Sequence, residues 1–205
     1  MLLRRRGHPP ARLIGLLIIA VLTTSCSTVG GGHRGLRIAA AFYPLAYVAE
    51  RVAGDHAEVV NLTTPGREPH DLEPSIAQVG QIAEADLVVL LGGFQPPVDT
   101  AAAEYASGTV LDVADVVALR PFSGSTSTEL DPHFWQDPLL MAKLGDAVAD
   151  RLTELDPTHA TDYRAGAQEL RTQLVALDQD YRTGLSGCAR STVVVSHDAF
   201  GYLSR

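Results

Sequence analysis

The chain has 205 residues, 46% of them hydrophobic, and a formal net charge of −8. That length accommodates one large domain, or one domain and part of another, and the apolar content is sufficient for a core. The negative charge argues against nucleic-acid binding and against electrostatic adsorption to anionic lipid. We therefore expect neither nucleic acid nor a charged lipid surface among the partners.

Residues 1–25 are predicted to be a secretory signal peptide and not part of the fold. Arginines at positions 4, 5 and 6 precede an apolar run at residues 13–22, which is too short to span a bilayer. Three small residues then lead to Cys26, an ending that resembles a bacterial lipobox. We expect cleavage before Cys26 and a lipid on its sulfur; the alternative is a plain signal peptide. Residues 26–35 form a glycine-rich, flexible tether.

Apolar segments with strand and helix periodicity alternate along residues 36–156. We expect strands at residues 36–42, 58–62, 86–91 and 109–113, and helices at residues 45–53, 73–85 and 137–155. The segment 86–91 is apolar on both faces, as strands are when helices cover both sides of a parallel sheet. The pattern therefore indicates an α/β lobe over residues 36–156. Residues 124–128 are expected to form a short polar loop.

A long helix is predicted over residues 157–185, beginning at Asp156 and Pro157. Its charged outer face suggests a rigid span between two lobes, with residues 186–205 opening the second α/β lobe. Within that segment, residues 193–195 predict a buried strand and residues 199–203 the first turn of a helix. Because nothing in the chain would cover them, we expect the chain to stop inside an incomplete second lobe.

Cys188 has no partner within the chain if Cys26 carries a lipid. Outside the cytoplasm, an unpaired cysteine favours either a disulfide to a residue beyond the chain or a buried, inert thiol.

Three histidines from distant segments stand at turns between the predicted elements. His70 follows the second strand, His133 lies between two Asp-Pro pairs, and His197 follows residues 193–195. Neutral imidazole is a common zinc ligand, and three of them nearly complete a tetrahedral site. Since ligands gather at the carboxyl ends of strands in α/β sheets, we expect a metal site at that edge.

Four neighbouring residues are candidates for supporting these ligands. Asp71 and Glu73 follow His70, and Asp131 precedes His133, so their carboxylates are placed to orient an imidazole or to favour a cation. Trp135 is the sole tryptophan and is expected to form a wall of the site. The remaining histidines of the mature chain, His33, His56 and His159, are expected to be surface residues.

The stretches PHDLEPS, DPHFWQDP and SHDAFGYL, around His70, His133 and His197, resemble in order and spacing the metal-binding solute-binding proteins of ABC importers, a zinc and manganese family. The resemblance extends from the signal peptide to Arg205. It implies two α/β lobes joined by a long rigid helix, with the ion in the cleft between them. It also implies that His70 and His133 are ligands from the first lobe, that His197 comes from the second, and that a carboxylate ligand lies beyond Arg205.

The resemblance implies a function in transport and not an enzyme. We expect a monomeric, lipid-anchored receptor on the extracytoplasmic face of the membrane, or a secreted or periplasmic one without the lipid, that captures Zn²⁺ and delivers it to an ABC permease. A third histidine favours zinc, since manganese-selective members carry a glutamate there. If the chain is naturally this short, we expect weaker zinc binding than the family shows, because His197 sits on an incomplete lobe.

Three alternatives remain open at this point. The first is a receptor for manganese or another divalent metal, and the second is a surface adhesin lipoprotein. The third is a zinc hydrolase, since three histidines and a water form a catalytic arrangement. Against the hydrolase, the sequence contains no His-Glu-x-x-His pair.

Overall fold

A four-stranded parallel sheet forms the centre of the described part of the chain, in the order β2-β1-β3-β4. The computed structural model describes residues 35–122, 129–190 and 192–204. The strands are β1 (Leu36–Ala40), β2 (Ala57–Asn61), β3 (Leu87–Leu90) and β4 (Thr109–Asp112). Every residue of the central strand β3 is buried, as its two-sided apolar sequence predicts. The parallel α/β class expected from the sequence is therefore confirmed.

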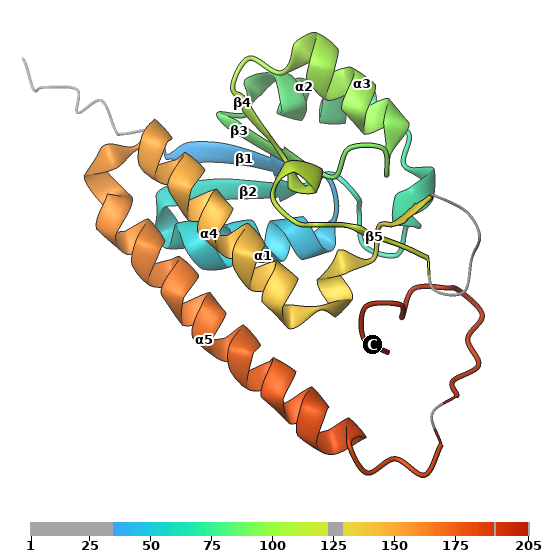
Figure 1. Ribbon diagram of the computed structural model, residues 1–205. Helices are drawn as coiled ribbons and strands as arrows, with labels where there is room; N and C mark the ends of the chain where they lie inside the picture. Colours follow the sequence, from blue (N-terminus) through green and yellow to red (C-terminus); the bar gives the residue numbers. More distant parts are fainter. Residues whose placement is uncertain (1–34, 123–128, 191, 205) are drawn as a thin grey trace, which may run out of the picture. The chain divides into compact units, whose positions relative to one another are not determined.

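Helices cover both faces of this sheet (Figure 1). On one face, α1 (Tyr43–Ala53), α4 (Pro138–Leu155) and α5 (Ala160–Leu185) pack against one another, and on the other α2 (Ile76–Glu84) packs against α3 (Pro96–Tyr105). The chain moves toward one edge of the sheet from β1 to β2, and toward the other edge from β2 to β3 and from β3 to β4. Because crossovers between parallel strands are right-handed, the helices of these two directions lie on opposite faces. The buried apolar side chains of the sheet and of these helices form one continuous core.

Two helix starts follow from short capping sequences. The side chain of Asp137 accepts hydrogen bonds from the backbone of Leu139 and Leu140, and proline occupies the first position of α4, as the sequence predicts. At α2, Ser75 and Gln78 form a reciprocal capping box. The predicted start at residue 73 is therefore too early, since Ser75 is the residue that satisfies the first free amides of the helix.

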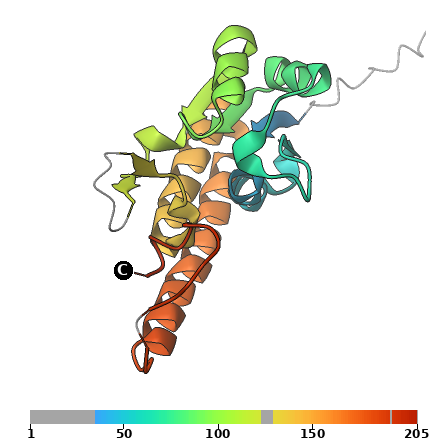
Figure 2. The same ribbon diagram turned by 90° about the vertical axis from the view of Figure 1, so that its right-hand side faces the viewer.

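The long predicted helix is present as α5, which has 26 residues and follows a short 3-10 turn at Pro157–His159. Its first half packs on α1 and α4, as Figure 2 shows from the side. Gly166 permits the close approach to α1, because a Cβ there would lie 2.7 Å from the carbonyl oxygen of Val52. Residues 181–190, at and beyond its C-terminal end, are all exposed.

Three expectations differ from the structure. The helix α3 is present although the sequence did not predict it. Residues 193–195 form no strand, and their valines are 75%, 94% and 42% exposed. No described strand pairs with this segment, and a strand needs a partner for its backbone groups. Residues 199–203 form only a turn, closed by hydrogen bonds from Leu203 and Ser204 to the carbonyl of Phe200.

Several predicted segments lie outside the described residues: the signal peptide, Cys26, nearly all of the tether and the loop at residues 124–128. None of the helices in the described ranges combines the length and the hydrophobicity that crossing a membrane requires. Two further short strands, β5 (Arg120–Pro121) and β6 (Leu130–Asp131), pair in antiparallel fashion, and β6 leads into the 3-10 turn Phe134–Gln136. This strand pair positions the central residue of the site described next.

Candidate metal centre

The site lies over the carboxyl edge of the sheet, between the loops that follow β1 and β3. These loops lead to helices on opposite faces of the sheet, which is where ligands bind in open α/β sheets. Aromatic rings line its base: Phe42, after β1, contacts Phe94, after β3, with ring centroids 4.9 Å apart. Trp135 packs against Phe42 at 5.3 Å. The fold thus provides a rigid apolar floor on which polar ligands can be held.

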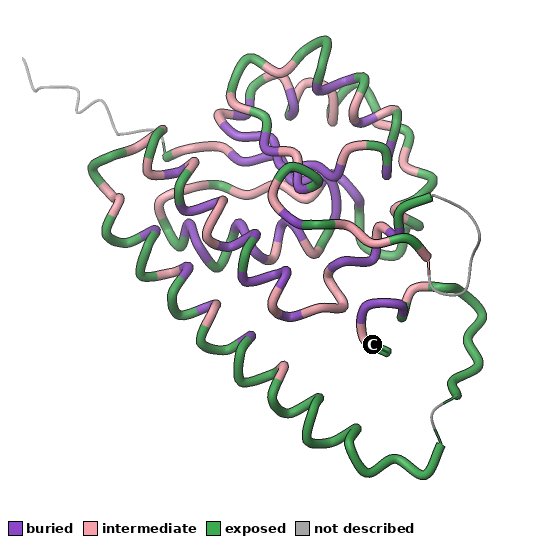
Figure 3. Tube along the Cα trace, viewed as in Figure 1, coloured by how far each residue is buried: buried purple, intermediate pink, exposed green. Residues whose placement is uncertain are grey.

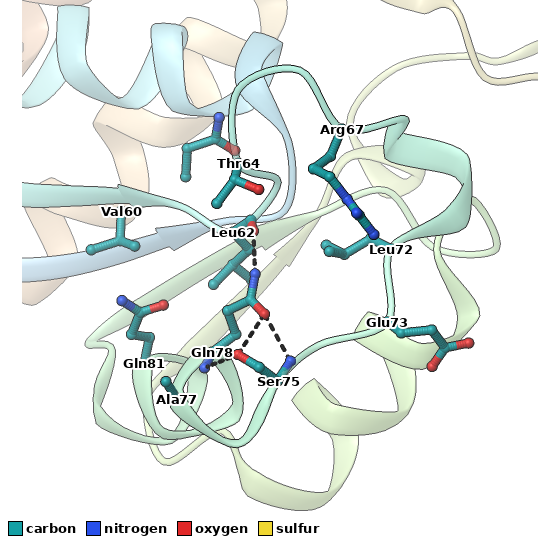
Figure 4. A pocket seen from close by; sticks show the side chains of 11 residues that line it. Val60, Leu62, Thr64, Arg67, Leu72, Glu73, Ser75, Ala77, Gln78 and Gln81 are labelled. Atoms are coloured by element: carbon teal, nitrogen blue, oxygen red, sulfur yellow. Dashed lines mark hydrogen bonds between the residues drawn. The ribbon is translucent and has the colours of Figure 1, made fainter.

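One side chain bonds both ends of the loop that carries His70. Gln78, in the first turn of α2, donates from Nε2 to the carbonyl of Leu62 at 2.5 Å and accepts from the amide of Ser75 at 2.7 Å. Figure 4 shows these bonds beside a hollow of about 480 Å³, which Arg67 and Glu73 also line. Because Leu62 and Ser75 flank the loop, Gln78 fixes both of its ends.

A second side-chain amide, this one buried, fixes the middle of this loop. Gln95 is 2% exposed, and its Nε2 donates to the carbonyl of Pro69 at 2.6 Å and to the hydroxyl of Thr63 at 3.2 Å. Thr63 in turn donates to the carbonyl of Ala41 at 2.8 Å. The residue before His70 is therefore tied to the loops after β1 and β3. Sequence reasoning missed this role of Gln95.

His133 is the most constrained of the three histidines. It is 2% exposed, and its Nδ1 lies 2.7 Å from Oδ1 of Asp131, which is itself fully buried. The same oxygen accepts from the backbone amide of His133 at 3.0 Å. This arrangement assigns the proton to Nδ1 and leaves the lone pair of Nε2 facing the site, which is the tautomer a metal requires. The ring of Trp135 packs against His133 at 5.1 Å.

His197 reaches the same place from the exposed C-terminal segment. Its Nε2 lies 3.0 Å from Nε2 of His133, and its ring lies 5.4 Å from that of His70. One nitrogen of each histidine lies within 4.8 Å of the others, and this is the sole such group of three or more potential ligands among the described residues. With Zn–N bonds of about 2.0–2.1 Å, tetrahedral ligand nitrogens are separated by about 3.3–3.4 Å. Small side-chain movements would thus seat an ion.

Electrostatics at His70 favour its neutral, ligand-competent form. Burial lowers the pKa of His70; the nearby charge of Glu68 opposes this shift, and the neighbouring His133 and His197 add to it. Glu68 also accepts a hydrogen bond from the amide of His70 at 3.3 Å, and its Oε1 lies 4.0 Å from Nε2. A metal ion must displace protons from its imidazole ligands, so a lowered pKa reduces that competition.

The predicted supporting residues divide into two groups. Asp131 and Trp135 contact His133 directly, whereas Asp71 acts on His70 only through its charge, and Glu73 lines the separate hollow of Figure 4. Glu68, which the sequence did not single out, is the carboxylate whose contact with His70 is seen. A cleft of about 450 Å³ opens beside His70, lined in part by Phe94, Phe122 and Glu129.

His56 and His159 lie at the surface, as expected, with about a third of each side chain exposed. Their rings stack face to face, with centroids 4.0 Å apart. Each contacts a carboxylate: His56 that of Asp162, and His159 that of Asp156. His33 lies outside the described residues. Cys188 is exposed with a free thiol, so the buried-thiol alternative is wrong, while a disulfide to a residue beyond the chain stays a prediction.

Comparison with known proteins identifies the family. The family model described as zinc-uptake complex component A, periplasmic (ZnuA), matches residues 38–205. The chain belongs to the ZnuA family. This confirms the resemblance inferred from the three histidine motifs, all of which fall within the matched range.

Individual members of the ZnuA family are similar along most of the chain. The zinc-binding lipoprotein AdcA of Streptococcus pneumoniae is 28% identical over 91% of this chain and 40% of its own length. The manganese-binding lipoprotein MntA of Halalkalibacterium halodurans is 28% identical over 91% of this chain and 64% of its own. The crystal structure of Zn(II)-bound AdcA from S. pneumoniae superposes with a TM-score of 0.75 at 30% identity, covering 83% of this chain and 37% of that one. The chain thus spans less than two thirds of these relatives.

Proposed function

We propose that His70, His133 and His197 bind Zn²⁺, and that the protein is the metal receptor of an ABC importer. The observation that carries this proposal is the convergence of one nitrogen from each histidine within 4.8 Å. The segments that bring them together are far apart in sequence, and His133 is held by a buried carboxylate in the tautomer that a metal needs. A histidine that only stabilises the fold does not need two further histidines beside it.

The chemistry of the ligands supports zinc as the transported ion. Three imidazole nitrogens suit zinc, whereas manganese prefers oxygen ligands. The relatives bear on the same choice, because the names of AdcA and MntA specify zinc and manganese respectively. Among the described residues, the carboxylate paired with His70 is that of Glu68, whose Oε1 lies 4.0 Å from Nε2 of the imidazole. The nitrogen-rich set therefore favours zinc over manganese.

The proposed role is reversible binding and not catalysis. A receptor has to hold the ion during capture and lose it on delivery to the permease, so at least one ligand must be able to withdraw. His133 is buried, while His197 lies on an exposed segment. This difference suits capture and release. We further propose that the protein acts on the extracytoplasmic face of the membrane, attached through a lipid on Cys26, or in secreted or periplasmic form without it.

A zinc titration of the purified protein tests this proposal. We expect one Zn²⁺ per chain by isothermal calorimetry, with binding lost in His133→Ala. The matched control is His159→Ala, which removes a partly buried histidine that also pairs with an aspartate but lies outside the site. The site is refuted if His133→Ala binds zinc as the wild type does. Equal affinity for manganese and zinc would overturn the choice of metal.

A further inference from the structure

The described residues of the segment that carries His197 are mostly exposed. Residues 186–190 and 192–198 are exposed, as Figure 3 shows along the path from the end of α5. Burial returns at Gly201 and Tyr202, and Tyr202 is 5% exposed. A ligand on such a segment stays in place only if the chain is fixed near it. Among the described residues of this segment, Tyr202 is the large buried side chain that follows His197.

The hydroxyl of Tyr202 makes two hydrogen bonds to the short strands that precede His133. It accepts from the backbone amide of Arg120 at 2.9 Å and donates to the backbone carbonyl of Asp131 at 3.0 Å. The guanidinium of Arg120 also lies over the Tyr202 ring, 5.3 Å from its centroid. One side chain therefore bridges β5 and β6 and ties the C-terminal segment to both.

Asp131 joins this attachment to the metal site. Its backbone carbonyl accepts from Tyr202, and its carboxylate holds Nδ1 of His133. The Nε2 atoms of His133 and His197 lie 3.0 Å apart. Asp131 thus connects the two histidines: it contacts His133 directly, and it contacts Tyr202, which lies a few residues after His197 in the chain. Releasing the Tyr202 hydroxyl would free His197 to withdraw without disturbing His133.

We propose that Tyr202 is a positioning residue for the metal site: its hydroxyl holds the His197 segment against β5 and β6 and so slows the departure of the bound ion. This inference rests on the proposed function, because the ion it concerns is the Zn²⁺ held by the three histidines. In this role Tyr202 acts by keeping His197 within reach of the ion.

The variant Tyr202→Phe removes the hydroxyl and keeps the ring in its buried position. Two hydrogen bonds are lost, and each contributes modestly in net terms, so we expect zinc to dissociate about tenfold faster. The association rate should change much less, since the cleft and the other two ligands are intact. Dissociation is measured by stopped flow into excess chelator, and association by mixing with zinc. Tyr105→Phe, an exposed tyrosine at the end of α3, is the matched control.

A second measurement tests the attachment without metal. Hydrogen–deuterium exchange of the zinc-free protein should be faster in Tyr202→Phe than in the wild type for peptides covering residues 196–204, with α1 and β3 unchanged. Unchanged exchange there, or an unchanged zinc dissociation rate in a folded Tyr202→Phe protein, would overturn the inference. Failure of the wild type to bind zinc would refute the proposed function and the kinetic part of this inference, while the exchange result would still decide the attachment.

Discussion

Replacing Asp131 by asparagine should weaken zinc binding without unfolding the protein. Asparagine has nearly the same volume, so the packing of this fully buried side chain is preserved. What changes is the charge: the carboxylate oxygen that now lies 2.7 Å from Nδ1 of His133 becomes a neutral amide oxygen. The imidazole then keeps a hydrogen-bond acceptor at Nδ1 but loses the negative charge that raises its basicity.

The size of this effect follows from the contact. Removing the hydrogen-bonding partner of a metal-bound histidine typically costs 10- to 100-fold in metal affinity, or about 1.4–2.7 kcal/mol. That range agrees with about 1.5–3 kcal/mol for a hydrogen bond to a charged group. Because Asp131 is buried, solvent screens this pair little, whereas asparagine can still accept the hydrogen bond, so we place the effect near the middle of the range. We expect a loss of affinity of about 30-fold for Asp131→Asn.

The assay is competition for zinc against a chelating dye, with thermal unfolding of the zinc-free protein recorded in parallel. Asp156→Asn provides a matched control, because Asp156 also lies against Nδ1 of a histidine, His159, but outside the metal centre. Its zinc affinity should remain within about twofold of the wild type, as expected for an independent site. A folded Asp131→Asn protein with unchanged zinc affinity would show that the carboxylate does not support the ligand, and the reasoning would fail.

Three further changes test the structure around the site. Hydrogen bonds, first from His159 and then from Thr158 and Tyr163, lower the pKa of Asp156, so its stabilising contribution is present above the ordinary value of 3.8 and is lost as the pH falls below it. Urea unfolding should therefore show Asp156→Asn less stable by about 1 kcal/mol at pH 7 and nearly equal to the wild type in strong acid. Gln95→Ala should cost about 2 kcal/mol in the same assay, because it leaves the carbonyl of Pro69 unpaired, and it should also weaken zinc binding in the dye assay. Gly166→Ala should destabilise by about 1–3 kcal/mol in urea, whereas Gly184→Ala, with open space around it, should stabilise by up to about 1 kcal/mol.

The sequence predicts those features that depend on local patterns. The apolar run before Gly92 is a buried strand, and Asp137 with Pro138 begins a helix, because these signals act over a few residues. The three histidines could be selected because each stands at a turn. Their convergence depends on contacts between segments distant in sequence, and it was implied by the resemblance to a family and not by local patterns.

The features that the sequence misses depend on contacts between distant segments. The helix α3 begins with two prolines and contains three consecutive alanines, so its sequence lacks a strong apolar stripe. Its helical structure is supported by packing against α2, which the local sequence does not reveal. Gln95 owes its role to the carbonyl of Pro69, which meets it only in the folded chain. Residues 193–195 show the reverse case: their composition favours a strand, but a strand exists only beside a partner.

The three histidines differ in how firmly the protein holds them, and under the proposed function this difference matters because the ion must be released. His133 is fixed by a buried carboxylate, and the loop of His70 is tied by Gln78 and Gln95. His197 lies on a segment whose exposed residues contribute little to a core. An ion that leaves such a site does so with least cost by losing the ligand that is least constrained. Under the proposed function, withdrawal of His197 would therefore release the ion while His133 and the loop of His70 stay in place.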